Sequence, residues 1–457
     1  MSADQPHPAS FRDPSGFLFR REGDLFRRVA PAYANDYDLL LSSGLYDELT
    51  REGLLVPHEE VDLDGHADAH RVLRPEVVPF VSYPYEWSFS ALRDAALLTL
   101  DIAGRALARG LVLKDASAFN VQFRGCVPVF VDTLSFETYR EGEPWVAYRQ
   151  FCEHFLAPLA LMARTDVRLA GLWRANLDGV PLDLGSGLLP RSTWLRFGLL
   201  AHVHLHARSQ ARYADRPAPR RRLAVTRTSL LALLDSLRSA VEALRPRRSV
   251  SAWADYEQTH SYGDEARRHK EESVAGWIET LAPARVWDLG ANVGRYSRLA
   301  ADRGAYTVAF DIDPAVVEAA YQAGHAEGRR NLLPLEQDLA NPSPGLGWAG
   351  RERDSLEARG PADLALALAL VHHLAIGRNV PLRKLARWMG RLARSLIVEF
   401  VPKDDPQTAR LLRSRRDVFP DYDQRGFEAA FGAELRLEAT RPLPGSGRVV
   451  YLWSGRD

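Results

Sequence analysis

The feature that most constrains the fold is a regular alternation of apolar strand-like runs and amphipathic helix-like segments from about residue 251 onward. Helical spacing of apolar residues recurs between the runs, and Pro314 lies in the first turn of one such segment. The strand-like runs are 285–290, 306–313, 332–340, 362–374 and 395–401. This alternation predicts an α/β domain with a mostly parallel sheet, helices on both faces and a ligand at the carboxyl ends of the strands. Residues 435–455 predict a terminal antiparallel pair.

A glycine-punctuated turn, "DLGANVG" at 288–294, follows the first predicted strand. Small residues at such a turn let backbone amides approach a ligand at the N-terminus of the next helix. Asp311 ends the second strand, 21 residues after Gly290, where a carboxylate can accept both hydroxyl hydrogens of a ribose. Asp338 ends the third strand, placed to reach an adenine amino group. These positions indicate a nucleoside-containing ligand.

Together these motifs resemble those of class I S-adenosylmethionine-dependent methyltransferases, over residues 251–457. The resemblance implies a Rossmann-like methyltransferase domain with an antiparallel last strand, and S-adenosylmethionine as cofactor. It implies that Asp288 and the backbone of the turn hold the methionine moiety. The turn residues concerned are Gly290, Asn292 and Gly294, with Asn292 in place of a central glycine. Asp311 is then expected at the ribose, Ile312 at the adenine face and Asp338 at the adenine amino group. The alternative is a degenerate nucleotide fold without a ligand.

Methyl transfer requires an acceptor held in line with the methyl group, and a base if the acceptor must lose a proton. His372 and His373 follow the fourth predicted strand and are the first candidates for that base. Alternatively, one of them caps the next helix and the other packs inward. Glu399, at the end of the fifth strand, is the second candidate. Aromatic residues ahead of the first strand form either a lid or an ordinary packed helix: Trp253, Tyr256, His260 and Tyr262.

The N-terminal half has a second group of polar residues. After a predicted hairpin and a long helix ending at Gly110, Asp115 and Asn120 are five residues apart, and Asp132 follows an apolar strand. This spacing resembles the catalytic loop and metal-binding segment of the protein-kinase-like fold. The resemblance implies that Asp115 takes the position of the catalytic base and that Asn120 and Asp132 are metal ligands.

The same half departs from the kinase pattern in several places. No glycine-rich phosphate loop is found, and Arg27 or Arg28 has to replace the usual strand lysine. Three interpretations stay open: a degenerate kinase-like fold that binds an acceptor or partner, a working phosphotransferase, and an unrelated α+β domain. In the last, Asp115 and Asp132 are turn and capping residues.

A change in composition divides the chain. Residues 208–227 are rich in arginine and proline, and the following segment has the spacing of one amphipathic helix, ended by Pro246. We therefore expect an N-terminal α+β domain at 1–207, a hinge with a connecting helix at 208–250 and the methyltransferase-like domain at 251–457.

Charge and composition limit the partners. The 457 residues include 59 basic and 59 acidic residues, so no overall charge attracts nucleic acid or an anionic membrane. The two cysteines cannot form a disulfide framework, and no apolar run has the length of a signal peptide or membrane span. The expectation is a cytoplasmic methyltransferase that acts on an oxygen or nitrogen of a small molecule or metabolite, with the N-terminal domain recognising the acceptor or a partner. The alternatives are a kinase-like phosphotransferase or bifunctional protein, and a non-catalytic scaffold.

Overall fold

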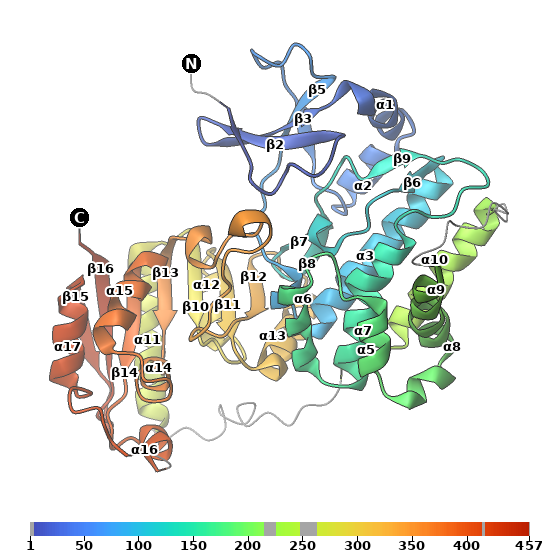
Figure 1. The fold of residues 1–457 in the computed structure, drawn as a ribbon. Coiled ribbons are helices and arrows are strands. Elements are labelled where there is room, and N and C mark those ends of the chain that lie inside the picture. The colour runs from blue at the N-terminus through green and yellow to red at the C-terminus, as the bar shows by residue number, and fades with distance from the viewer. Residues whose placement is uncertain (1–3, 214–224, 247–262, 414–415, 457) are drawn as a thin grey trace. The chain divides into compact units, whose positions relative to one another are not determined.

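The computed structural model describes residues 4–213, 225–246, 263–413 and 416–456, and Figure 1 shows its helices and strands. The chain forms two compact units. Unit 1 comprises Met1–Phe123, Pro128–Arg247 and Leu346–Arg353, and unit 2 comprises Arg124–Val127, Arg248–Gly345 and Asp354–Asp457.

Unit 1 begins with a five-stranded antiparallel sheet in the order β1-β2-β3-β5-β4. Its elements are β1 (Gln5–Pro6), β2 (Gly16–Arg21), β3 (Asp24–Val29), α1 (Ala34–Ser42), α2 (Leu45–Arg51), β4 (His58–Glu60) and β5 (Arg71–Pro75). The predicted hairpin is confirmed as β2–β3, because Phe19 and Phe26 pair across it and pack with Val72 of β5. The alternation of apolar residues thus gives this sheet one packed face.

The rest of unit 1 is mainly helical. Its elements are α3 (Phe89–Ala108), β6 (Leu111–Leu113), β7 (Val121–Arg124), β8 (Val127–Phe130), β9 (Phe136–Thr138), α4 (Tyr148–Phe151), α5 (Ala157–Arg164), α6 (Leu172–Ala175), α7 (Leu182–Leu188), α8 (Phe197–Leu199), α9 (His206–Tyr213) and α10 (Arg227–Glu242). The predicted long helix is α3, capped at its start by the Ser88 hydroxyl and followed by Gly110 with a φ of 80°. An antiparallel sheet followed by a helical part that carries Asp115 and Asp132 bears out the kinase-like resemblance at the level of the fold.

The segment 208–250 differs from the expected hinge. Helix α9 covers its start, and the predicted connecting helix, α10, packs along α3 inside unit 1. Leu230, Leu234 and Leu237 of α10 are buried. The apolar face of this amphipathic helix therefore packs into the core of unit 1, and the helix does not serve as a linker. Residues 214–224 and 247–250 lie outside the described part of the chain.

Unit 2 contains a seven-stranded sheet in the order β12-β11-β10-β13-β14-β16-β15. The strands are β10 (Arg285–Leu289), β11 (Tyr306–Asp311), β12 (Leu332–Glu336), β13 (Ala362–Ala367), β14 (Ala393–Phe400), β15 (Leu435–Pro442) and β16 (Val449–Gly455). The first five pair in parallel, whereas β16 is antiparallel to both of its neighbours. The expected α/β class, Rossmann-like with an antiparallel last strand, is therefore confirmed.

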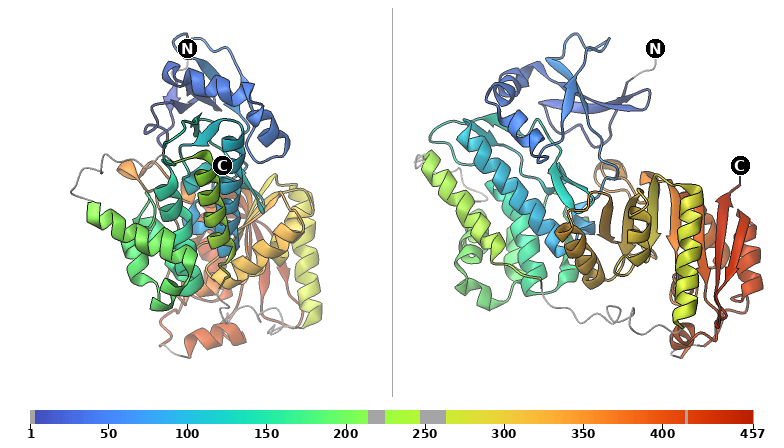
Figure 2. Two further views of the ribbon diagram at one scale, coloured as in Figure 1. Left: turned by 90° about the vertical axis from the view of Figure 1, so that its right-hand side faces the viewer. Right: turned by 180° about the vertical axis from the view of Figure 1, so that it is seen from behind.

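Helices cover both faces of this sheet (Figures 1 and 2). They are α11 (Asp264–Leu281), α12 (Arg295–Ala301), α13 (Pro314–Ala326), α14 (Val371–Ala375), α15 (Leu382–Leu392), α16 (Pro406–Leu412) and α17 (Gln424–Gly432). Val274 and Ile278 of α11 and Ala300 of α12 share one core cluster with sheet residues such as Leu364 and Val450. Helices α15 and α17 pack against each other on the opposite face.

The strand order reverses between β10 and β13. From β10 the chain proceeds outward through β11 and β12, and it then returns to the other side of β10 through β13. In open parallel sheets the crevice at such a reversal is where ligands bind. Within the described ranges, no helix combines the length and apolar character needed to cross a membrane.

Candidate functional site

The glycine-punctuated turn joins β10 to α12 and has an unusual backbone. Gly290, Asn292 and Gly294 have φ values of 77°, 51° and 82°, all in the left-handed region. Glycine adopts this region without strain, and asparagine tolerates it better than most residues. This preference accounts for Asn292 in place of a central glycine.

The amides of the turn are committed to the protein itself. Those of Gly290 and Ala291 donate to the Phe310 carbonyl, and that of Gly294 donates to Ala291. The other two turn amides donate to side chains: Asn292 to Asp311 Oδ2 at 2.8 Å, and Val293 to the Asn292 Oδ1 at 2.7 Å. The expectation that these amides face a ligand is therefore corrected, because each already donates a hydrogen bond within the protein. The small side chains of the turn instead leave space at the cavity wall.

A cavity of about 440 Å³ lies at the carboxyl ends of the strands of unit 2. It brings together six of the residues predicted from sequence: Gly290, Asn292, Asp311, Ile312, Asp338 and His373. Leucines complete much of its wall: Leu339, Leu368, Leu370, Leu374 and Leu411. The cavity is thus largely apolar and carries two carboxylates, which follow neighbouring strands. This is the composition expected of a small-molecule site.

The two carboxylates are held in place by backbone amides. Asp311 accepts hydrogen bonds from Asn292 and, at 2.9 Å, from the Asp313 amide, while Asp338 accepts one from Ala340 at 2.9 Å. Burial raises the pKa of Asp311, although these amides act in the opposite direction. Beside Asp311, Ile312 is 52 % exposed and presents an apolar side chain to the cavity.

Gln337 is a cavity residue that the sequence reasoning missed. In the chain it lies between Glu336, the last residue of β12, and Asp338. Its side chain is buried, lines the cavity, and accepts a hydrogen bond at Oε1 from the Ser343 hydroxyl at 3.0 Å. Its Nε2 is buried without a partner among the described residues. A buried unpartnered amide next to a cavity indicates a place for a ligand acceptor atom. Its position directly before Asp338 was the only signal in the sequence.

Asp288 and Gly294 lie behind the cavity wall. The Asp288 carboxylate is buried and accepts a 2.6 Å hydrogen bond from the Ser297 hydroxyl, which fastens β10 to α12. Burial raises the pKa of Asp288 to about 6. Gly294 is the N-terminal cap of α12. In this structure both residues shape the turn and do not line the cavity.

The two histidines take different positions. His373 lines the cavity from α14, and burial, assisted by the positive charge of Arg448, lowers its pKa to about 4. His372 is fully buried, with its ring 4.1 Å from that of His373. Both of its ring nitrogens are without a partner in the described part of the chain. Of the two candidate bases, only His373 is in contact with the cavity.

Glu399 does not fit the predicted role of a base. It is fully buried, and its carboxylate accepts from Lys270 Nζ at 2.7 Å and from Arg448 Nη1 at 3.1 Å. Arg448 also donates to Asp405, which caps α16. Burial favours the neutral form, but the two cations outweigh it and lower the pKa of Glu399. This group connects α11, β14 and the start of α16, so Glu399 is a structural residue, in correction of the sequence prediction.

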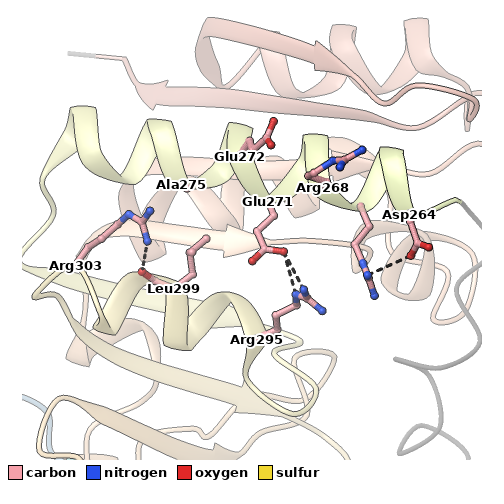
Figure 3. Close-up of a pocket in the computed structure, with 9 residues that line it drawn as sticks. Asp264, Arg268, Glu271, Glu272, Ala275, Arg295, Leu299 and Arg303 are labelled. Carbon is pink, nitrogen blue, oxygen red and sulfur yellow. Dashed lines mark hydrogen bonds and ion pairs between the residues drawn. The ribbon is translucent and has the colours of Figure 1, made fainter.

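A second hollow in unit 2 lies between α11 and α12 (Figure 3). Its lining is mostly charged, and several of its charges pair with one another, as in the 2.9 Å pair of Glu271 with Arg295. It lacks the largely apolar wall of the cavity at the strand ends. The predicted lid residues Trp253, Tyr256, His260 and Tyr262 lie outside the described residues.

In unit 1, the three residues of the kinase-like motif do come together. Asp115 accepts hydrogen bonds from the Ser117 amide at 2.9 Å and from Gln150 Nε2 at 2.8 Å. Asn120 and Asp132 are both linked to the Ser135 hydroxyl. The strand position is occupied by Arg27, whose Nη1 lies 2.5 Å from Asp132 Oδ1, whereas Arg28 pairs with Asp68.

Comparison with known proteins places this chain in a family. The nodulation protein NoeA of Rhizobium meliloti (strain 1021) is 35% identical over 452 residues, which is 97% of this chain and 94% of NoeA. The chain belongs to the NoeA family. No protein-family model matches the sequence. The match to NoeA extends through both units.

Solved structures resemble parts of this NoeA-family chain. The bifunctional kinase-methyltransferase WbdD is 18% identical with a TM-score of 0.30, and the match covers 45% of this chain and only 43% of WbdD. Magnesium protoporphyrin IX methyltransferase (ChlM) from Synechocystis PCC 6803, solved with bound SAH, is 21% identical with a TM-score of 0.31 over 44% of this chain and 93% of ChlM. The assignment of the methyltransferase fold rests on the strand order of unit 2 itself.

Proposed function

We propose that unit 2 is an S-adenosylmethionine-dependent methyltransferase whose acceptor is an oxygen or nitrogen atom of a small molecule or metabolite. The observation that carries the proposal is the set of groups around one cavity: the Asp311 carboxylate, the exposed Ile312 side chain and the Asp338 carboxylate, on the ends of two neighbouring strands. These groups match the chemistry of a ribose diol, a flat apolar ring and an exocyclic amino group in turn.

The residues present fit the cofactor. Asp311 is fixed by two backbone amides, so its remaining lone pairs can accept from two ribose hydroxyls without rearrangement. Gln337 offers a donor that has no partner in the described residues, suited to a ring nitrogen of adenine. Leu339 and Ile312 supply apolar surface for the ring itself. S-adenosylmethionine supplies an activated methyl group when bound.

His373 is the residue that we assign to proton removal from the acceptor. It is in contact with the cavity, and its neutral imidazole has a ring nitrogen that can accept a proton. His372 and Glu399 have no such access. Unit 1 would then recognise the acceptor or a partner, as the degenerate kinase-like interpretation implies.

The test is calorimetric titration of the full chain with S-adenosylhomocysteine. We expect one binding site, weakened at least about tenfold in Asp311→Ala, because hydrogen bonds to a charged group are lost. Asp302→Asn is the matched control, since Asp302 lies at the far end of α12 and pairs with Arg329 on the surface. Absence of binding in the folded wild-type protein would refute the proposal.

A further inference from the structure

The kinase-like motif of unit 1 implies a divalent cation held by Asn120 and Asp132. Whether these residues fit a cation depends on what their oxygen atoms already contact. Oδ1 of Asp132 accepts from Arg27 Nη1 at 2.5 Å and from the Leu134 amide at 3.1 Å. Oδ2 accepts from the Ser135 hydroxyl. Both carboxylate oxygens are therefore engaged by donors of the protein.

Asn120 and Asp115 are engaged in the same network. Asn120 Nδ2 donates to the Ser135 hydroxyl at 3.1 Å, and this hydroxyl in turn donates to Asp132. The Asn120 amide also hydrogen-bonds to Asp115, which accepts from Gln150 as well. The three residues of the motif thus form one continuous set of hydrogen bonds, with Arg27 at one end and Gln150 at the other.

Arg27 is well placed to supply the positive charge that this set requires. Its side chain is only 12 % exposed and lies between Asp132 and Asp13, the latter at 3.6 Å. A guanidinium is always charged and presents several donors in a fixed plane, so it can neutralise two carboxylates at once. Lys114, the other cation nearby, is hydrogen-bonded to Ser15 at 2.6 Å and lies over the Tyr33 ring.

We propose that the Arg27 guanidinium replaces the divalent cation in unit 1, so that the centre formed by Asp115, Asn120 and Asp132 works without a metal. A divalent cation that binds Asp132 would either displace Arg27 from a partly buried ion pair or lie beside it. In the second case two positive charges would compete for one carboxylate. The centre is then a fixed structural element of a recognition unit and has no phosphoryl-transfer activity. This inference is independent of the function proposed for unit 2.

The test measures free Mn²⁺ by electron paramagnetic resonance during titration of the full chain, with and without ATP. We expect no Asp132-dependent binding in the wild-type protein: Asp132→Asn leaves the titration unchanged. Arg27→Met removes the internal cation and exposes the carboxylates, so this variant gains about tenfold or more in Mn²⁺ affinity, as opposite charges at such distances dictate. The double variant Arg27→Met, Asp132→Asn loses that gain.

Arg28→Met is the matched control. Arg28 is the next residue on β3, and its guanidinium pairs with Asp68, on the other side of the strand from Asp132. Its removal is expected to leave Mn²⁺ binding as in the wild-type protein. One Mn²⁺ or Mn²⁺–ATP site in the wild-type protein that disappears in Asp132→Asn would overturn the proposal. That comparison stays decisive even if Arg27→Met fails to fold.

Discussion

The backbone amide of Asn292 donates a 2.8 Å hydrogen bond to the carboxylate of Asp311, and this bond joins the turn after β10 to the end of β11. The pair connects the two features on which a ribose-binding site depends: a turn without bulky side chains and a carboxylate at the neighbouring strand end. Asn292 takes part only because it adopts a φ of 51°. The position of the carboxylate is therefore coupled to the backbone conformation of the turn.

Substitution of Asn292 tests this coupling. Asn292→Ala keeps the amide but places a less tolerant residue at a positive φ, at a cost of about 1–2 kcal/mol in the free energy of unfolding. Asn292→Gly adopts the same φ freely and is expected to lose less stability, although it also lacks the Oδ1 that accepts from Val293. Urea denaturation of both variants checks this order. If Asn292→Gly is as destabilised as Asn292→Ala, the φ of Asn292 is not what the residue provides.

The sequence predicted unit 2 well because its pattern is local. The parallel sheet follows from the alternation of strands and helices, and the positions of Asp311, Ile312 and Asp338 follow from the ends of the strands. The hydrogen bonds that the turn amides donate could not be predicted, because several of their acceptors lie on the next strand or in side chains.

Glu399 shows the limit of sequence reasoning in another way. Its position at a strand end suggested catalysis, but Lys270 and Arg448, which neutralise it, are 129 and 49 residues away in the chain. No spacing rule connects residues at such separations. In unit 1, likewise, the choice between Arg27 and Arg28 required the side-chain directions on β3.

Removal of the Glu399 charge is expected to destabilise unit 2. Glu399→Gln leaves Lys270 and Arg448 buried without the carboxylate that both of them contact, and breaking a buried pair in this way costs about 3–5 kcal/mol. Chemical denaturation at neutral pH measures the loss. The control is Glu279→Gln, an exposed acid that pairs with Arg303 on the surface and is expected to change stability little.

The pH dependence of this effect has a definite sign. The pKa of Glu399 is lower in the folded than in the unfolded chain, so its contribution is complete above the unfolded value of about 4.3 and is lost as the pH falls through the folded value. The difference in stability between wild-type protein and Glu399→Gln should therefore narrow in acid. A difference independent of pH down to the acid transition would contradict the assignment.

His372 is expected to lower stability in mild acid. Burial first, then the neighbouring His373 and the charges of Arg448 and Lys270, keep its pKa far below the unfolded value, so below about pH 6.5 the unfolded chain takes up a proton that the folded chain does not. His372→Phe removes this penalty, and its melting temperature should fall less than that of the wild-type protein between pH 7 and pH 5. An equal fall in melting temperature in both proteins between pH 7 and pH 5 would contradict this assignment.

Gln337 offers a hydrogen-bond donor and Asp338 an acceptor, and this difference gives a test of ligand orientation. An amide Nε2 can only donate, so Gln337 suits a ring nitrogen of adenine, whereas the Asp338 carboxylate can only accept and suits the exocyclic amino group. Replacing that amino group by hydrogen, as in the purine-riboside analogue of S-adenosylhomocysteine, keeps the ring nitrogens as acceptors and should weaken binding to the wild-type protein and to Gln337→Met alike. In Asp338→Ala the two ligands should bind almost equally.

Calorimetric titration of both ligands against each variant measures this discrimination. Gln337→Met is expected to lose about three- to tenfold in affinity for either ligand, the range of one neutral hydrogen bond. Ser343→Ala is its control, since it removes the hydrogen bond to Gln337 Oε1 and leaves the Gln337 side-chain amide in place. If Gln337→Met, and not Asp338→Ala, abolishes the preference for the adenine ligand, the base is oriented the other way in the cavity, with its amino group at residue 337.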